Sequence, residues 1–159
     1  MLNTSREALY RIFMLSYAYR TTGELKFAER AEKEMLYMAG YDNWNPEHFL
    51  DVAEMTMALS IGYDWLYEVL SPKNRAKIRK AILDKGLKPS MDKRYNGFLD
   101  KTNNWSQVCN TAMAYGAIAL METDEKLCRK IMERSIEEIR KPMSSYGPDG
   151  AYPEGYGYW

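Results

Sequence analysis

The 159-residue sequence has two cysteines and a single histidine, and this scarcity removes two common kinds of site. Cys109 and Cys128 are too few for a disulfide framework, and they show no CxxC spacing. With His48 as the only imidazole, a Cys/His zinc site is nearly excluded. We expect two buried free thiols, because free cysteine behaves as a small hydrophobic residue; one disulfide between neighbouring helices is the alternative.

The sequence also lacks net charge and long hydrophobic runs. Its 22 basic and 22 acidic side chains balance without a basic block, so no nucleic-acid footprint is visible. No stretch reaches the roughly 18 consecutive apolar residues of a membrane span, and residues 1–6 do not resemble a signal peptide. Hydrophobic residues still make up 46% of the chain, which excludes wholesale disorder.

Large side chains are plentiful, with 13 Tyr, 4 Trp and 11 Met. Tyr and Trp combine a flat apolar face with a polar group, and this combination suits grooves that bind carbohydrate rings. The alternative interpretation is a helical core rich in large side chains.

Hydrophobic periodicity predicts six helices and no β-strand. The expected ranges are Ser5–Thr21, Glu24–Met38, Pro46–Leu70, Ser71–Lys85, Asn104–Met121, and Thr123 to just before Pro142. Thr4 and Glu7 fit a capping box at the start of the first helix. Asn45 and Ser71, each followed by proline, fit caps of the third and fourth.

These helices alternate in kind along the chain. The first, third and fifth are apolar nearly all round, whereas the second, fourth and sixth are amphipathic. An all-round apolar helix must be covered on every side, and an amphipathic helix has one wet face. A period of about 50 residues then predicts stacked helical hairpins, with inner helices side by side and outer helices shielding them.

The predicted fold class is therefore all-α, with helical hairpins that form part of an (α/α) toroid or solenoid. We expect residues 1–159 to be a single helical domain. An inner face is left unpaired at each end of the three hairpins, and a Gly/Pro/Tyr-rich loop follows Pro142. We therefore expect the chain to be part of a longer protein, with a natural C-terminal tail as the alternative.

Three segments carry residues suited to chemistry. Residues 103–110 concentrate amides at the start of an uncharged helix, with Asn103, Gln107 and Asn110 on one face. Such amides form either a network that ties the 88–101 loop to the helix, with Asn104 as a plain N-cap, or a set of donors at the mouth of a cavity.

The other two segments are loops. The tyrosines of residues 148–158 could stack on a ligand and transfer protons, or only cover the rim of the fold. In residues 41–48, Trp44 could stack on a sugar, while a lone His48 is more often a structural hydrogen-bonding group than a catalyst. Asp51 and Glu54 share a helix face, as paired carboxylates of a glycoside hydrolase would, although supporting or solvated carboxylates are the simpler interpretation.

Four blocks of the sequence together resemble the heparinase II/III-like family. They are WNPEHFLDVAEM (residues 44–55), GYDWLY (62–67), NNWSQVCN (103–110) and DGAYPEGYGYW (149–159). The resemblance covers most of the chain from Trp44 onward and implies the first part of an (α/α) toroid. The rest of the toroid and the family's β-sandwich domain would then be absent from this chain.

The resemblance also implies an activity, the cleavage of uronic-acid-containing polysaccharide such as heparan sulfate or alginate by β-elimination. It implies that Asn104 stabilises the developing enolate and that Tyr158, or else Tyr156, transfers the proton. Characterised members commonly have histidine after that Asn, and this chain has Trp105 instead. The expected substrate-binding residues are Asn103, Trp105, Gln107, Glu154, Trp44 and His48.

Loops that precede inner helices emerge on one side of a hairpin array, so we expect one shared site there. Asn103, Asn104, Gln107, Glu154 and Tyr158 should converge at this rim. No cofactor or metal is expected in this chain, although the resemblance leaves room for a structural metal in the missing domain. The resemblance further implies a periplasmic or extracellular bacterial protein with an acidic polysaccharide or oligosaccharide as its partner.

Two other functions remain open at this point. One is a glycoside hydrolase on the same toroid that uses Asp51 or Asp149. The other is a non-catalytic helical module that binds glycans. We expect residues 1–159 alone to be inactive, and the sequence leaves the glycan and the oligomeric state open.

Overall fold

The computed structural model describes residues 1–157, and in that range the chain is helical without a β-strand. The main helices are α1 (Leu2–Thr22), α2 (Leu25–Ala39), α3 (Phe49–Trp65), α4 (Pro72–Ala81), α5 (Asn104–Ala119), α6 (Glu125–Glu138) and α7 (Arg140–Met143). A π-helix, η1 (Ile82–Leu87), continues α4, and the short 3-10 helices are η2 (Pro89–Met91), η3 (Gly97–Asp100) and η4 (Ser144–Tyr146). The predicted all-α class is confirmed.

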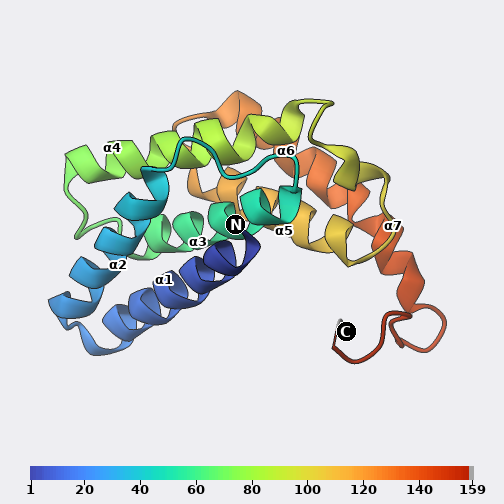
Figure 1. The fold of residues 1–159 in the computed structure, drawn as a ribbon, viewed down its shortest axis with the longest axis horizontal. Helices are drawn as coiled ribbons and strands as arrows, with labels where there is room; N and C mark the ends of the chain where they lie inside the picture. The colour runs from blue at the N-terminus through green and yellow to red at the C-terminus, as the bar shows by residue number, and fades with distance from the viewer. Residues whose placement is uncertain (158–159) are drawn as a thin grey trace.

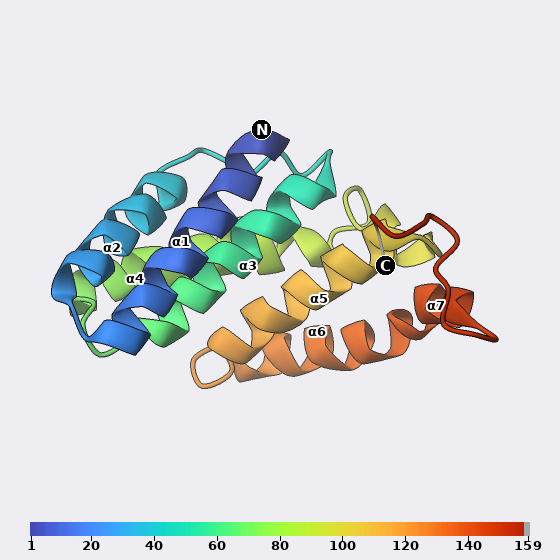
Figure 2. The ribbon, with the colours of Figure 1, turned by 90° about the horizontal axis from the view of Figure 1, so that it is seen from below.

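The helices form two layers. In one layer α1, α3 and α5 lie side by side, with α3 in the middle (Figure 2). Behind them, α2 packs on α1, η1 packs on α3, and α6 packs on α5 (Figure 1). The three hairpins therefore have the predicted order of inner and outer helices.

Burial differs among the three inner helices. In α3, 13 of 17 residues are buried, because helices cover it on both sides and behind. At the edges of the layer, α1 and α5 leave apolar side chains exposed: Tyr10, Phe13, Met14, Tyr17, Val108, Tyr115 and Ile118. The expectation that all three are covered on every side thus holds only for α3.

Two glycines set the close approach of α3, η1 and α5. A Cβ on Gly86 would lie 2.4 Å from Thr56 Oγ1, and a Cβ on Gly116 would lie 2.8 Å from Thr56 Cγ2. Thr56 is itself fully buried, and its hydroxyl donates to the Val52 carbonyl. The absence of a side chain at both positions lets these backbones pack tightly around one threonine.

The predicted start of the third helix at Pro46 is wrong. Asn45 adopts a left-handed φ of 56°, and the helix begins only at Phe49. The Asn45 side chain does not cap the backbone, because its Nδ2 donates to Asp51 Oδ2 at 2.6 Å. Residues 45–48 form a turn, closed by the His48 N–H on the Asn45 carbonyl, that places His48 directly before α3.

Other boundaries also differ from the predictions. The first helix begins at Leu2, so the Thr4 capping box does not form. The sixth helix ends at Glu138, before Pro142 as predicted, although it begins at Glu125 and not at Thr123. Pro142 lies in the first turn of the short helix α7, where a missing N–H costs little. The Ser71 cap is confirmed by its side chain, which accepts a hydrogen bond from the Asn74 N–H.

Both cysteines are buried free thiols, as expected. Burial raises the pKa of Cys109 to about 12 and that of Cys128 to about 11. Thiolate chemistry at either residue is therefore disfavoured at neutral pH.

Candidate functional site

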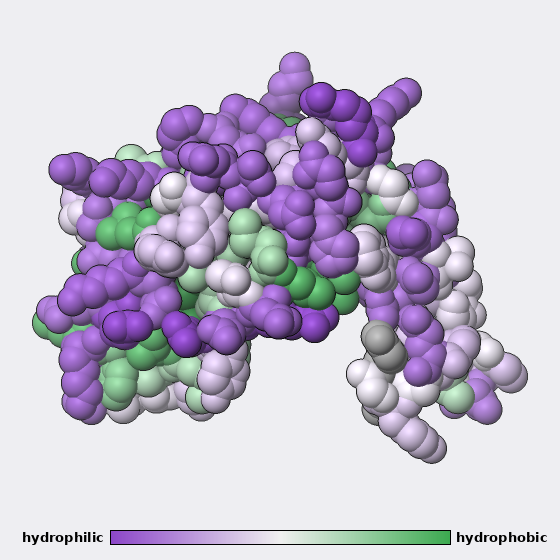
Figure 3. Space-filling model, viewed as in Figure 1, coloured by the Kyte–Doolittle hydropathy of each residue, from purple (hydrophilic) through white to green (hydrophobic). Residues whose placement is uncertain are grey.

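The connections that lead into α3 and α5 lie at one edge of the inner layer, together with the N-terminus. Figure 2 shows the N-terminus, residues 40–48 and the segment 147–157 along this edge. In the space-filling view, the C-terminal segment projects away from the helical body and leaves an open notch beside it (Figure 3). Most of the predicted site residues lie on these connections or on the first turns of the helices that follow.

Two adjacent asparagines at the start of α5 have different roles. Asn103 is the N-cap, since its Oδ1 accepts a hydrogen bond from the Trp105 N–H at 3.2 Å. The backbone N–H of Asn104 donates to Glu154 Oε2 at 3.2 Å. Within residues 1–157 the Asn104 side-chain amide has no hydrogen-bond partner. The plain N-cap is therefore Asn103, and the Asn104 amide is available to a ligand.

Glu154 joins the C-terminal segment to α5. The oxygen that accepts from Asn104 also accepts from the Tyr152 hydroxyl, at 2.7 Å. Tyr152 is 6% exposed, and its ring stacks on Tyr146 with centroids 4.9 Å apart. The Tyr146 hydroxyl in turn lies 3.4 Å from Gln107 Oε1, which accepts its hydrogen bond. Glu154 and Gln107 thus come together with Asn104 as predicted. The Glu154 carboxylate accepts hydrogen bonds from Asn104 and Tyr152 and so holds the C-terminal segment against α5.

Sequence reasoning missed Tyr152 as a member of this cluster. Nothing in the local pattern separates it from the other tyrosines of the segment, and Glu154, which accepts its hydrogen bond, links it to Asn104, 50 positions before Glu154 in the sequence. The only local indication of its role is that it lies two residues before Glu154, the residue that accepts its hydrogen bond.

The environment of Tyr152 changes its acidity. Burial raises the pKa of Tyr152 to about 12, and the hydrogen bond to the Glu154 carboxylate and its charge add to this effect. A phenol with such a pKa stays protonated at neutral pH. Tyr152 is therefore suited to holding the segment in place and not to abstracting a proton.

This shift gives a testable pH dependence. The folded state holds Tyr152 as a neutral phenol above the ordinary pKa of 10.0, so its stabilisation is complete below about pH 10 and is lost as the pH rises towards about 12. Tyrosine ionisation is measured by ultraviolet absorbance in the wild type and in Tyr152→Phe. The difference between the two titration curves should correspond to one group that ionises near pH 12. A difference centred near pH 10, with folding verified by circular dichroism, would contradict this.

His48 and Trp105 bring the 41–48 loop into the same site. The two rings meet edge to face with centroids 4.9 Å apart and an interplanar angle of 85°. The Lys101 ammonium lies 5.5 Å from the centroid of the Trp105 indole ring. The Trp105 ring therefore contacts the His48 imidazole and lies near the Lys101 ammonium, and its neighbour in the chain is Asn104, whose amide is free.

The other predicted residues have different outcomes. Trp44 is completely buried, and its indole N–H donates to the Met38 carbonyl at 3.0 Å, so the expectation that it stacks on a sugar is wrong. Tyr156 is fully exposed. Tyr158 lies outside the described residues, and its position in the site stays a prediction.

The carboxylates of α3 do not resemble those of a glycoside hydrolase. Asp51 is 1% exposed and accepts from Asn45, while Glu54 pairs with Arg6 at 3.3 Å. Burial is the main cause that raises the pKa of Glu54. Asp149 lies on the exposed C-terminal segment, where it accepts from the Ala151 N–H. These carboxylates thus have structural partners within residues 1–157.

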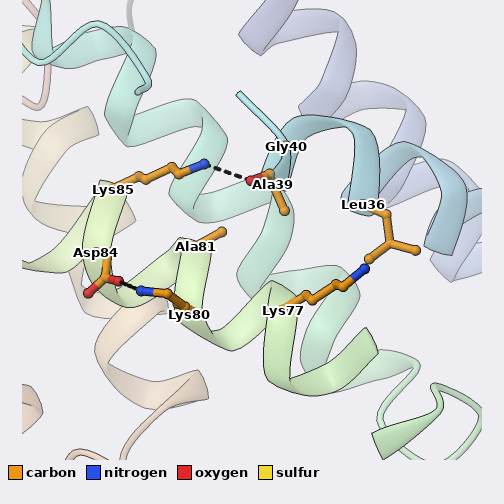
Figure 4. A pocket seen from close by; sticks show the side chains of 8 residues that line it. All are labelled: Leu36, Ala39, Gly40, Lys77, Lys80, Ala81, Asp84 and Lys85. Atoms are coloured by element: carbon orange, nitrogen blue, oxygen red, sulfur yellow. Dashed lines mark hydrogen bonds and ion pairs between the residues drawn. The ribbon is translucent and has the colours of Figure 1, made fainter. Parts of the chain in front are cut away.

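A second pocket, of about 380 Å³, lies between α2 and α4 and is lined by three lysines (Figure 4). The Lys85 ammonium donates to the carbonyls of Ala39 and Tyr41 at the end of α2. Lys80 pairs with Asp84. Lys85 therefore joins η1 to the end of α2, whereas Lys80 is paired along its own helical segment, so two of the three cations already have partners.

Among residues 1–157 no group of three or more His, Cys, Asp or Glu side chains could hold a metal ion. None of the helices in that range is both long and apolar enough to cross a membrane. The sequence matches no family model, and a search of curated proteins found no match. The functional conclusion therefore depends on the chemistry of the residues around the start of α5, which are Asn104, Glu154, Trp105 and His48.

Proposed function

We propose that the chain is the helical part of a polysaccharide lyase that cleaves uronic-acid-containing polysaccharide by β-elimination. In this proposal the three hairpins make up about half of an (α/α) toroid. The observation that supports it most directly is the unpartnered amide of Asn104, next to a tyrosine-rich segment that Glu154 binds to the same helix start.

The chemistry requires two kinds of group. Removal of the C5 proton places negative charge on the uronate carboxylate, and a neutral amide donor such as Asn104 stabilises that charge. A tyrosinate accepts the C5 proton, the C4–O4 bond breaks, and the departing oxygen takes a proton to leave a C4–C5 double bond. Tyr156, which is fully exposed, and Tyr158 are the candidates for this transfer.

The experiment is an assay of the protein expressed from its complete open reading frame on alginate, heparan sulfate and hyaluronan. Elimination creates a conjugated double bond with ultraviolet absorbance, whereas hydrolysis releases reducing ends without it. We expect the absorbance to rise with at least one acidic polysaccharide and with no neutral one. New reducing ends without absorbance would instead favour the hydrolase, and binding without turnover would favour the glycan-binding module.

A further inference from the structure

Asp51 is a buried carboxylate with an incomplete set of partners. It lies in the first turn of α3 and is 1% exposed. One oxygen, Oδ2, accepts from Asn45, while Oδ1 has no hydrogen-bond partner among residues 1–157. Because a buried negative charge is costly unless it is paired, this position favours a positive or hydrogen-donating neighbour.

His48 is that neighbour. Its Nδ1 lies 3.5 Å from Asp51 Oδ2, and the turn of residues 45–48 fixes the backbone that carries it. The imidazole is 39% exposed, although the carboxylate behind it is almost fully covered. Since Nδ1 is the nitrogen nearest to Asp51, Nε2 is left for another group.

The imidazole also lies beside the α5 start. Its ring contacts Trp105, the residue that follows Asn104 in the chain. The Lys101 ammonium lies near the indole ring, and Glu47 is the residue before His48 in the turn. A buried carboxylate, an accessible imidazole and a free amide therefore lie on neighbouring helix starts.

We infer that His48 and Asp51 form a carboxylate-binding pair: Asp51 orients the imidazole through Nδ1, and the protonated ring donates its Nε2–H to the carboxylate of the bound acidic sugar. The inference rests on the proposed function for the identity of the ligand. Asp51 is a positioning residue, because it is buried and acts through His48. The pair adds a second donor beside the Asn104 amide, since the His48 ring contacts Trp105, the next residue in the chain.

The first test uses the fact that the chain has one histidine, so its imidazole gives a single set of NMR signals. In ¹⁵N-labelled protein, at a pH where the ring is neutral, we expect the Nδ1–H tautomer in the wild type. Asp51→Asn should weaken that preference, and Glu47→Gln, the matched control on the exposed neighbouring carboxylate, should retain it. An Nε2–H tautomer in the wild type overturns the pairing, even where Asp51→Asn fails to fold.

The second test probes the ligand directly. Sodium glucuronate at millimolar concentration should shift the His48 signals, whereas the uncharged methyl ester of glucuronic acid should leave them unchanged. Equal shifts with both compounds, or shifts with neither, would overturn a carboxylate-binding role for the imidazole.

The third test separates this inference from the proposed function. In the complete open reading frame, His48→Gln should lower kcat about ten- to a hundredfold, as expected for the loss of a charge-assisted hydrogen bond, with a smaller change in KM. An active enzyme that is insensitive to His48→Gln overturns the inference and leaves the lyase proposal standing. No elimination by the wild type, together with the predicted tautomer and glucuronate shifts, overturns the lyase proposal and leaves the pair standing as a carboxylate-binding site.

Discussion

Replacement of Trp44 by alanine is expected to lower the free energy of unfolding by about 3–5 kcal/mol. The ring is completely buried, so its loss leaves a large cavity between the end of α2 and the start of α3. It also removes the donor to the Met38 carbonyl. For a chain of this size the melting temperature should fall by about 6–20 °C, as measured by circular dichroism or calorimetry.

Trp105→Ala is the matched control for this measurement. Trp105 is only partly buried and contacts His48 and Lys101, so its removal should cost much less stability. If Trp44 were a sugar-binding ring, Trp44→Ala would instead leave the melting temperature nearly unchanged and weaken only glycan binding. That outcome would contradict the buried position described above.

Asn104→Ala is expected to reduce turnover by about 100- to 1,000-fold in the protein made from the complete open reading frame. The change removes the donor that would stabilise the enolate. Folding should be nearly unaffected, because the Asn104 side chain makes no hydrogen bond within residues 1–157. The variant also retains the hydrogen bond from the backbone N–H of residue 104 to Glu154. Initial rates of ultraviolet absorbance and a thermal melt measure the two effects separately.

Asn103→Ala is the natural comparison, since the same side chain occupies the adjacent position with a different role. Loss of the N-cap should cost about 0.5–2 kcal/mol of stability and a smaller factor in turnover. The reverse ranking, with Asn103 the more important residue for kcat, would move the catalytic amide by one position. Equal turnover in both variants and the wild type would remove the amide from the mechanism.

The helices themselves could be predicted from the sequence because burial of their faces is a repeating local pattern. Their exact starts could not be, since each depends on a competition that the pattern does not show. Asn45 has the right identity for an N-cap, yet its side chain binds Asp51 and its backbone is left-handed. At α5 two asparagines are adjacent, and only the geometry of the turn decides that Asn103 is the cap.

The site was predictable to the extent that it depends on topology. The C-terminal segment and the start of α5 do meet, through Glu154. The roles of single aromatic residues were not predictable, because they depend on which neighbours cover each ring. Trp44 is buried, Tyr152 is held by a carboxylate, and neither outcome has a local sequence signal.

The parallel course of α1, α3 and α5 has an electrostatic consequence. Each helix carries a partial positive charge of roughly half a unit at its N-terminal end, and all three ends lie at the same edge (Figure 2). The opposing negative end of α2 is partly neutralised by the Lys85 ammonium, which donates to the carbonyl of Ala39, its last residue, and to that of Tyr41 just beyond it. Carboxylates lie at two of these three ends: Asp51 is in the first turn of α3, and Glu154 Oε2 accepts from the Asn104 N–H at the start of α5. The helix dipoles therefore favour the position in which Glu154 holds the C-terminal segment against α5.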